Sequence, residues 1–144
     1  MGDLSKNLSR HEMACKCGCG FDTVDYVLVN VLQGAVDYFE EFLEVEIVLD
    51  VSGGNRCRRH NVSLRELFQS SDGKMGALTA DESEHIYARA ADVKLFEKVS
   101  GKQVAPSLVA AYFELFGKGL SVGRYSSRTH VDTRTDGGKR WRSM

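Results

Sequence analysis

The residue types that could do chemistry in this chain gather in two short stretches, and each stretch pairs a histidine with an aspartate. In residues 83–92, His85 precedes Asp92 by seven positions. Neighbours on a helix lie three or four residues apart, so we expect His85 on a loop or turn and Asp92 on the strand that follows. In the second stretch, His130 and Asp132 are two positions apart, which places both side chains on the same face of a strand.

A histidine and a carboxylate that converge on one point suit a zinc ion. A catalytic zinc takes three protein ligands and keeps a fourth position open for water. The third ligand would come from elsewhere in the chain, which has only three other histidines, His11, His60 and His130. Taken alone, the His85–Asp92 pair is a weak signal, and the plainer interpretation of His85 is a surface histidine beside a turn.

Basic residues gather after a predicted turn at residues 52–55. Arg56, Arg58 and Arg59 are followed by His60 and Asn61. Arginine binds a carboxylate through a two-pronged pair of hydrogen bonds, so this segment could hold an anion. A solvated basic loop is the plainer interpretation, and composition alone favours it.

Three of the four cysteines alternate with other residues, at Cys15, Cys17 and Cys19, and Cys57 stands apart. Two interpretations stay open. The cysteines are reduced structural thiols, with one pair closing as a disulfide under oxidising conditions, or they hold a second, structural zinc as thiolates. Two residues usually separate the paired cysteines of a zinc knuckle, so the spacing favours thiols or a disulfide.

Length and composition predict one folded domain, residues 1–144. The chain is 42% hydrophobic and 27% charged, which suits a packed core. The formal net charge of -1 gives no indication of a nucleic-acid partner. Residues 1–13 lack the apolar stretch of a signal peptide, and no run of about 20 apolar residues could span a membrane. We therefore expect synthesis in the cytoplasm and delivery by another agent if the target lies outside the cell.

Hydrophobic periodicity predicts the elements that must position these residues. Ser9 and Glu12 form a predicted capping box that opens a short helical turn. Longer helices are predicted at residues 23–43 and 106–116, with a weak helical piece at 64–68. Strands are predicted at residues 45–51, 90–96, 120–125 and 129–134.

The predicted elements assemble into an α+β fold, with helices packed against a mainly antiparallel sheet. On the strand at 90–96, Asp92 lies on the face opposite to Val93. Trp141 is expected to pack back onto the domain. The helix at 106–116 is expected to bury one apolar face, made of Leu108, Val109, Tyr112, Phe113 and Phe116.

Taken in chain order, these blocks resemble the zinc DD-peptidase family, which shares its fold with the hedgehog signalling domain. The family includes D-alanyl-D-alanine carboxypeptidases and phage L-alanyl-D-glutamate endopeptidases. The chain is most similar to a subgroup with an N-terminal Cys-x-Cys-Gly-Cys piece and a closing Arg-Trp, here residues 15–20 and 140–141. The resemblance covers about residues 8–141.

The resemblance implies a site and a zinc cofactor. The family's zinc ligands fall on His85, Asp92 and His130. Its arginine that grips a peptide carboxylate falls on Arg56, and its serine before the first ligand falls on Ser83. His60 and Asn61 match a His-Asn pair that would shape the pocket wall.

The chain departs from the family pattern at three positions. Ala88 stands where glycine is usual, and Gly53 where serine is usual. Ser127 stands three residues before the last ligand, where better-studied members carry a carboxylate that acts as the base. Asp132 is then either the base, which the sequence favours, or a residue that orients a metal ligand. Arg128 is expected to help stabilise the oxyanion.

The function implied by the resemblance is a zinc peptidase acting on peptidoglycan stem peptides, as a carboxypeptidase or endopeptidase. The alternative is a catalytically inactive, zinc-stabilised module that binds cell-wall peptide or a protein partner, which the serine at position 127 supports. The expected place of action is the cell wall, reached through phage lysis proteins or as part of a virion.

Overall fold

The computed structural model describes residues 2–57, 84–117, 119–133 and 140–142. In this part of the chain, five strands form one sheet in the order β1-β2-β4-β3-β5. Neighbouring strands run antiparallel except β3 and β5, which are parallel. This confirms the predicted α+β class with a mainly antiparallel sheet. The strands are β1 (Ile47–Gly53), β2 (Ala90–Glu97), β3 (Ser121–Arg124), β4 (Thr129–Asp132) and β5 (Arg140–Arg142).

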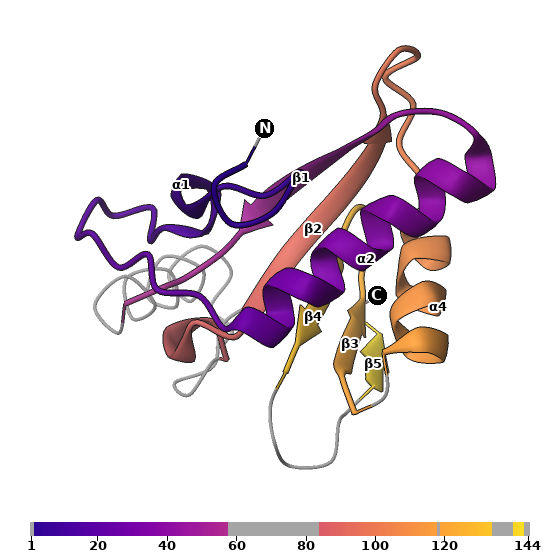
Figure 1. Ribbon diagram of the computed structural model, residues 1–144. Helices are drawn as coiled ribbons and strands as arrows, with labels where there is room; N and C mark the ends of the chain where they lie inside the picture. Colours follow the sequence, from indigo (N-terminus) through magenta and orange to yellow (C-terminus); the bar gives the residue numbers. More distant parts are fainter. Residues whose placement is uncertain (1, 58–83, 118, 134–139, 143–144) are drawn as a thin grey trace.

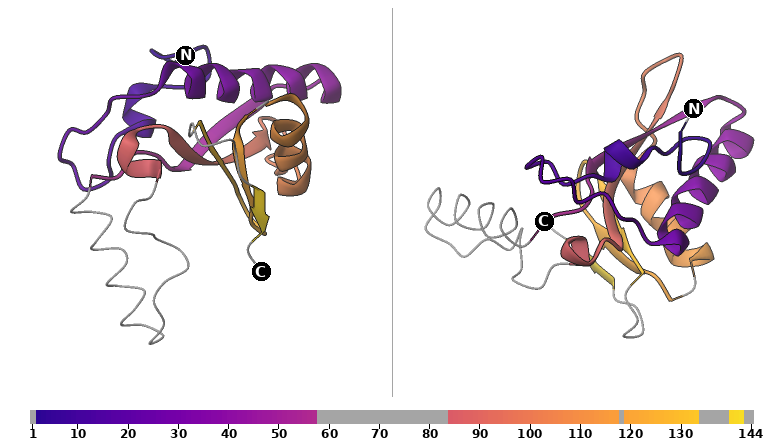
Figure 2. Two further views of the ribbon diagram at one scale, coloured as in Figure 1. Left: turned by 90° about the horizontal axis from the view of Figure 1, so that it is seen from below. Right: turned by 60° about the vertical axis from the view of Figure 1, so that its left-hand side comes forward.

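Two long helices cover one face of this sheet. Helix α2 (Tyr26–Leu43) packs against β1, and α4 (Pro106–Phe116) packs against β3 and β4. The two helices also contact each other, and they lie on the same side of the strands in both orientations drawn (Figures 1 and 2). The core lies between helices and sheet and includes Leu32, Phe39, Val93, Phe113 and Val131.

Short helical turns lie at one end of the sheet. Helix α1 (Arg10–Met13) begins after Ser9, whose backbone N–H donates to the Glu12 carboxylate at 2.7 Å, as the predicted capping box requires. The single 3₁₀ turn η1 (Glu84–Tyr87) carries His85 and leads into β2. No helix in the described ranges is both long enough and apolar enough to cross a bilayer.

Helix α2 begins three residues later than the predicted start at Thr23. Asp25 caps it, because its Oδ1 atom accepts from the N–H of Val27 at 3.3 Å. The backbone N–H of Asp25 donates to Ala88 O at 3.0 Å, which keeps this residue outside the helix. At the other end Glu44 takes a left-handed conformation, so β1 begins at Ile47 instead of Val45.

Helix α4 has the predicted bounds, but part of its predicted apolar face is wrong. Leu108 and Phe116 are 51% and 62% exposed. Val109, Ala110 and Phe113 are the residues that α4 buries against the sheet and α2.

One row of cross-strand partners runs across the whole sheet. Asp92 on β2 pairs with Gly53 on β1 and with His130 on β4. His130 pairs in turn with Gly123 on β3, which pairs with Trp141 on β5. Because Val93 and Val131 point into the core, alternation turns Asp92 and His130 to the sheet face away from α2 and α4. The sequence prediction for the faces of β2 is confirmed.

Several predicted features lie outside the described residues. They are the weak helical piece at residues 64–68, residue 134 at the end of the predicted strand at 129–134, and the packing of the Trp141 side chain. Thr133 is described and lies just after β4, which ends at Asp132.

Candidate metal centre

Three side chains from separate elements converge at the end of β2. His85 comes from η1, Asp92 from β2 and His130 from β4. The Asp92 carboxylate lies between the two rings, with its Oδ2 atom 3.4 Å from His85 Nε2 and its Oδ1 atom 3.0 Å from His130 Nδ1. One ligand atom from each residue lies within 4.8 Å of the others. The structure thus brings together the three residues that the sequence assigns to a metal.

The orientation of His85 is fixed from behind by backbone. Its Nδ1 atom lies 2.6 Å from Gly54 O, and a carbonyl can only accept, so Nδ1 carries the proton. The lone pair is therefore on Nε2, the atom that faces Asp92. The backbone of η1 is held to the same segment, because the N–H of Arg56 donates to His85 O at 3.1 Å.

His130 is oriented by a carboxylate on its own strand. Its Nε2 atom lies 2.7 Å from Oδ2 of Asp132, which is fully buried. The two residues share one face of β4, as the spacing predicts. Its other nitrogen, Nδ1, faces Asp92. The Asp132 contact is therefore on the opposite edge of the ring from the convergence point.

Mutual hydrogen bonding sets the charges of the three residues. Burial alone would raise the pKa of Asp92, but its contacts with the His130 and His85 rings hold it far below its usual range. Burial lowers the pKa of His85. Burial alone would also lower the pKa of His130, but hydrogen bonds with Asp132 and Asp92 outweigh it and raise the pKa.

This donor set fits zinc. Two imidazole nitrogens and a carboxylate are ligands that zinc accepts in catalytic sites. Each imidazole has its remote nitrogen bonded to an oxygen acceptor, Gly54 O or Asp132 Oδ2. Such bonds fix the ring orientation of metal-binding histidines and raise their basicity.

Two arginines lie near the convergence point. Arg128, half-buried, has its Nε atom 4.0 Å from Asp92 Oδ2, and its guanidinium lies 4.1 Å from the centre of the Tyr125 ring. Burial lowers the pKa of Arg56, and the charge of Asp92 opposes that shift. The positive charge of Arg128 also lowers the pKa of Arg56. Because Arg56 responds to the charges of both Asp92 and Arg128, both guanidinium groups are close to this centre.

Other predicted site residues differ in what the structure says about them. Ser83, His60 and Asn61 lie outside the described residues. Ser127 is exposed, and its carbonyl accepts from Gln103 Nε2 at 2.8 Å.

Residue types alone did not indicate the contribution of Gly53 and Gly54. A Cβ atom on Gly53 would lie 2.7 Å from Asp92 Oδ2, and one on Gly54 would lie 2.7 Å from Met13 O. The first glycine makes room for the carboxylate, and the second brings the acceptor for His85 close to α1. The paired glycines after a strand were the available signal, since adjacent glycines often mark close backbone approach.

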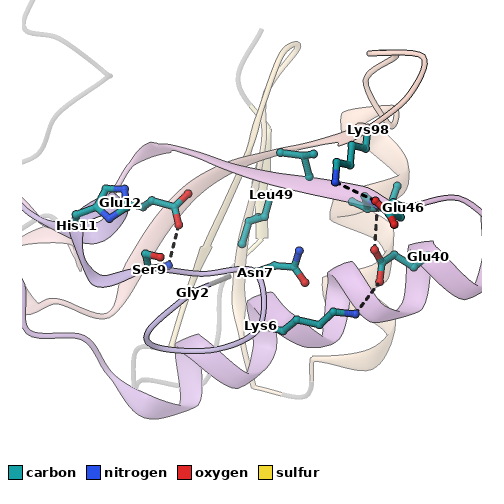
Figure 3. Close-up of a pocket in the computed structure, with 12 residues that line it drawn as sticks. Gly2, Lys6, Asn7, Ser9, His11, Glu12, Glu40, Glu46, Leu49 and Lys98 are labelled. Carbon is teal, nitrogen blue, oxygen red and sulfur yellow. Dashed lines mark hydrogen bonds and ion pairs between the residues drawn. The ribbon is translucent and has the colours of Figure 1, made fainter.

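A separate hollow lies between the N-terminal segment and the first residues of β1, and none of the three converging residues lines it (Figure 3). Its charged groups are paired with one another, Lys98 with Glu46 at 3.2 Å and Lys6 with Glu40 at 4.0 Å. His11 lines it and is exposed, as expected for the first turn of α1. The hollow therefore offers no chemistry comparable to that of the His85–Asp92–His130 centre.

The sequence pattern of the family described as peptidase M15 matches residues 6–132, which include all three converging residues. The chain belongs to the peptidase M15 family. No curated protein matches the chain. Membership in the M15 family confirms the resemblance to zinc DD-peptidases and makes the chain a metallopeptidase. The Cys-x-Cys-Gly-Cys subgroup stays a prediction.

Proposed function

We propose that this M15 peptidase uses zinc to cleave a peptide bond in the stem peptides of peptidoglycan, as a carboxypeptidase or endopeptidase. The observation that carries the proposal is the convergence of His85, Asp92 and His130 within 4.8 Å, with both rings oriented by contacts behind them. Zinc held by these residues would act as a Lewis acid and lower the pKa of a bound water toward neutrality.

For Asp132 the geometry supports the role of orienting His130 over that of the base. The Oδ2 atom of Asp132 accepts a hydrogen bond from Nε2 of His130, whereas the lone pair that would bind zinc is on Nδ1 of His130. The imidazole ring therefore separates the carboxylate from the metal position. Full burial also keeps Asp132 away from substrate and solvent.

The two arginines are proposed to act on the charges of the substrate. Arg128 lies beside Asp92 and is stacked on Tyr125, so its guanidinium is held where an oxyanion would form next to the metal. Arg56 is proposed to bind the free carboxylate of a stem peptide through its planar fork. The family resemblance adds Ser83 to this carboxylate site and His60 and Asn61 to the pocket wall.

The proposal is tested by zinc content and digestion of purified sacculi, with wild type, His85→Ala and His11→Ala compared. His11 is the matched control, because it is an exposed histidine that does not belong to the group of three converging residues. We expect wild type and His11→Ala to bind zinc at this centre and to release new amino groups. His85→Ala should lose both properties, and mass spectrometry of the fragments identifies the bond that is cut.

Two results would contradict the proposal. Hydrolysis by His85→Ala with no zinc bound at the histidine centre would exclude the metal mechanism. Zinc binding by wild type without release from any type of sacculus, together with retention on the sacculi, would favour the non-catalytic binding module. The exposed serine at position 127, where a base is usual, is the observation that keeps this second function in view.

A further inference from the structure

All four cysteines of the chain meet at one point, away from the histidines. Cys15, Cys17 and Cys19 come from the loop after α1, and Cys57 follows β1. Their sulfur atoms all lie within 4.8 Å of one another. Cys15 is buried, Cys57 is partly buried, and Cys17 and Cys19 are exposed.

The spacing of the sulfurs suits one tetrahedral ion. With zinc–sulfur bonds of about 2.3 Å, sulfurs at the corners of a tetrahedron lie roughly 3.8 Å apart. The Sγ atom of Cys17 is 3.4 Å from that of Cys15 and 3.6 Å from that of Cys57. The backbone N–H of Cys57 also donates to Cys15 Sγ at 3.4 Å, a contact that stabilises a thiolate.

The loop achieves this convergence in spite of its alternating spacing. Gly18 and Gly20, on either side of Cys19, both adopt positive φ, at 82° and 89°, a conformation that glycine adopts without strain. The turn is closed by two backbone hydrogen bonds, from Gly18 N to Cys15 O at 3.2 Å and from Cys15 N to Phe21 O at 2.9 Å. The glycines therefore supply the curvature that a two-residue separation supplies in an ordinary zinc knuckle.

Disulfides explain this arrangement less well. A disulfide needs a sulfur–sulfur bond of about 2.05 Å, and none of the four cysteines forms one in the structure. Cys17 lies at similar distances from Cys15 and Cys57, so the geometry selects no pair. Four thiols gathered around one point are typical of a closed structural metal site.

We propose that Cys15, Cys17, Cys19 and Cys57 bind a second zinc ion, a structural one, as a tetrathiolate. This inference does not depend on the proposed peptidase activity. The donor set is all sulfur and leaves no position open for water, so the ion would hold the fold together without taking part in hydrolysis.

The second ion would fasten the N-terminal loop to the segment that orients His85. Asn55, two residues before Cys57, donates its backbone N–H to Met13 O at 2.7 Å and its side chain to Thr23 O at 2.6 Å. The carbonyl oxygen of Gly54 accepts a hydrogen bond from the His85 ring. The backbone N–H of Arg56 donates to the carbonyl oxygen of His85. The tetrathiolate thus anchors the backbone that fixes one ligand of the catalytic centre.

The direct test is metal binding in the His85→Ala background, which disables the histidine centre. We expect His85→Ala to retain one zinc per chain, bound by the four cysteines. After cobalt exchange, the protein should show the intense near-ultraviolet band of thiolate-to-cobalt charge transfer. Adding Cys15→Ser and Cys57→Ser should abolish both zinc and band, whereas Lys16→Ala, an exposed neighbour in the same loop, should retain both.

A second measurement covers the case in which the cysteine variants do not fold. Folded His85→Ala protein is titrated with an organomercurial that reacts with thiolates, and released zinc is followed with a chelating dye. One zinc released as four thiols react supports the proposal. Absence of zinc and of the cobalt band, or a non-reduced mass that shows disulfides, would overturn it. A charge-transfer band in His85→Ala, together with wild-type protein that digests no sacculus, would leave this inference standing and the peptidase proposal refuted.

Discussion

The Nε2 atom of His130 lies 2.7 Å from Oδ2 of Asp132, on the opposite edge of the ring from the nitrogen that faces Asp92. One imidazole therefore bridges two carboxylates with different surroundings. Asp92 is partly exposed at the convergence point, and Asp132 is fully buried behind the ring. This difference supports the proposal that Asp92 binds the metal and that Asp132 orients His130.

Asp132→Asn should weaken zinc binding at the histidine centre by about 10–100-fold, because an amide orients the ring and raises its basicity less well than a carboxylate. Activity should return at saturating zinc. Isothermal titration with zinc and sacculus digestion at two zinc concentrations measure the effect. Asp50→Asn, an exposed carboxylate on β1, is the matched control. Full zinc affinity with lost turnover would instead make Asp132 the base.

Zinc affinity of the histidine centre should fall as the pH falls, beginning above the ordinary histidine pKa of about 6.5. Hydrogen bonds with Asp132 and Asp92 raise the pKa of His130, so its protonated form competes with zinc at higher pH than usual. Asp132→Asn removes part of that stabilisation and should move the loss of affinity to lower pH. Competition with a chelating dye between about pH 5 and 8 measures both curves. If the curves of wild type and Asp132→Asn coincide, Asp132 does not raise the pKa of His130.

Gly53→Ala should lower zinc affinity by about tenfold or more, because the new Cβ atom would lie 2.7 Å from Asp92 Oδ2 and push the carboxylate aside. Gly34→Ala in α2 is the control, since its Cβ would meet only the Tyr112 hydroxyl, at 3.1 Å. Unchanged zinc affinity in Gly53→Ala would mean that the Asp92 carboxylate binds metal from another position.

Ala88→Gly should stabilise the fold by about 0.5–1 kcal/mol. Ala88 has φ of 59°, and a left-handed conformation costs a non-glycine residue about 1–2 kcal/mol. Glycine avoids this strain, but it loses more conformational entropy on folding, which offsets part of the gain. Denaturant unfolding measures the change. Ala110→Gly in the middle of α4 should have the opposite sign, with a loss of about 1 kcal/mol. A destabilised Ala88→Gly variant would show that this strain is relieved by packing.

The parts of the structure that depend on periodicity could be predicted from the sequence. The faces of β2 follow from alternation, and α4 begins at Pro106 and ends before Gly117. Element ends depend on contacts from distant residues and were harder to predict. Helix α2 starts at Tyr26 because Asp25 is bonded to Ala88 O, 63 positions along the chain.

The three converging residues of the candidate site could be predicted from the sequence, but the groups that orient their side chains could not. The family resemblance assigns His85, Asp92 and His130 to the metal, and the structure brings these three residues together. The acceptor for His85 is a backbone carbonyl, which every residue has, so the paired glycines indicate a close backbone approach but not that Gly54 accepts from His85. For the positive φ of Ala88, the one signal was the glycine that is usual at this position in the family, because alanine itself does not indicate a left-handed conformation.

The row Gly53–Asp92–His130–Gly123 has a consequence for which length changes the chain can tolerate. A one-residue deletion inside β2 or β4 would turn one of the two ligands to the helix-covered face, since side chains alternate along a strand. Insertions at the exposed tip at residues 99–101, beyond the Phe96–Gln103 bridge, would leave the row unchanged. Among related chains, length variation should therefore gather at that tip and spare the strands that meet at the row.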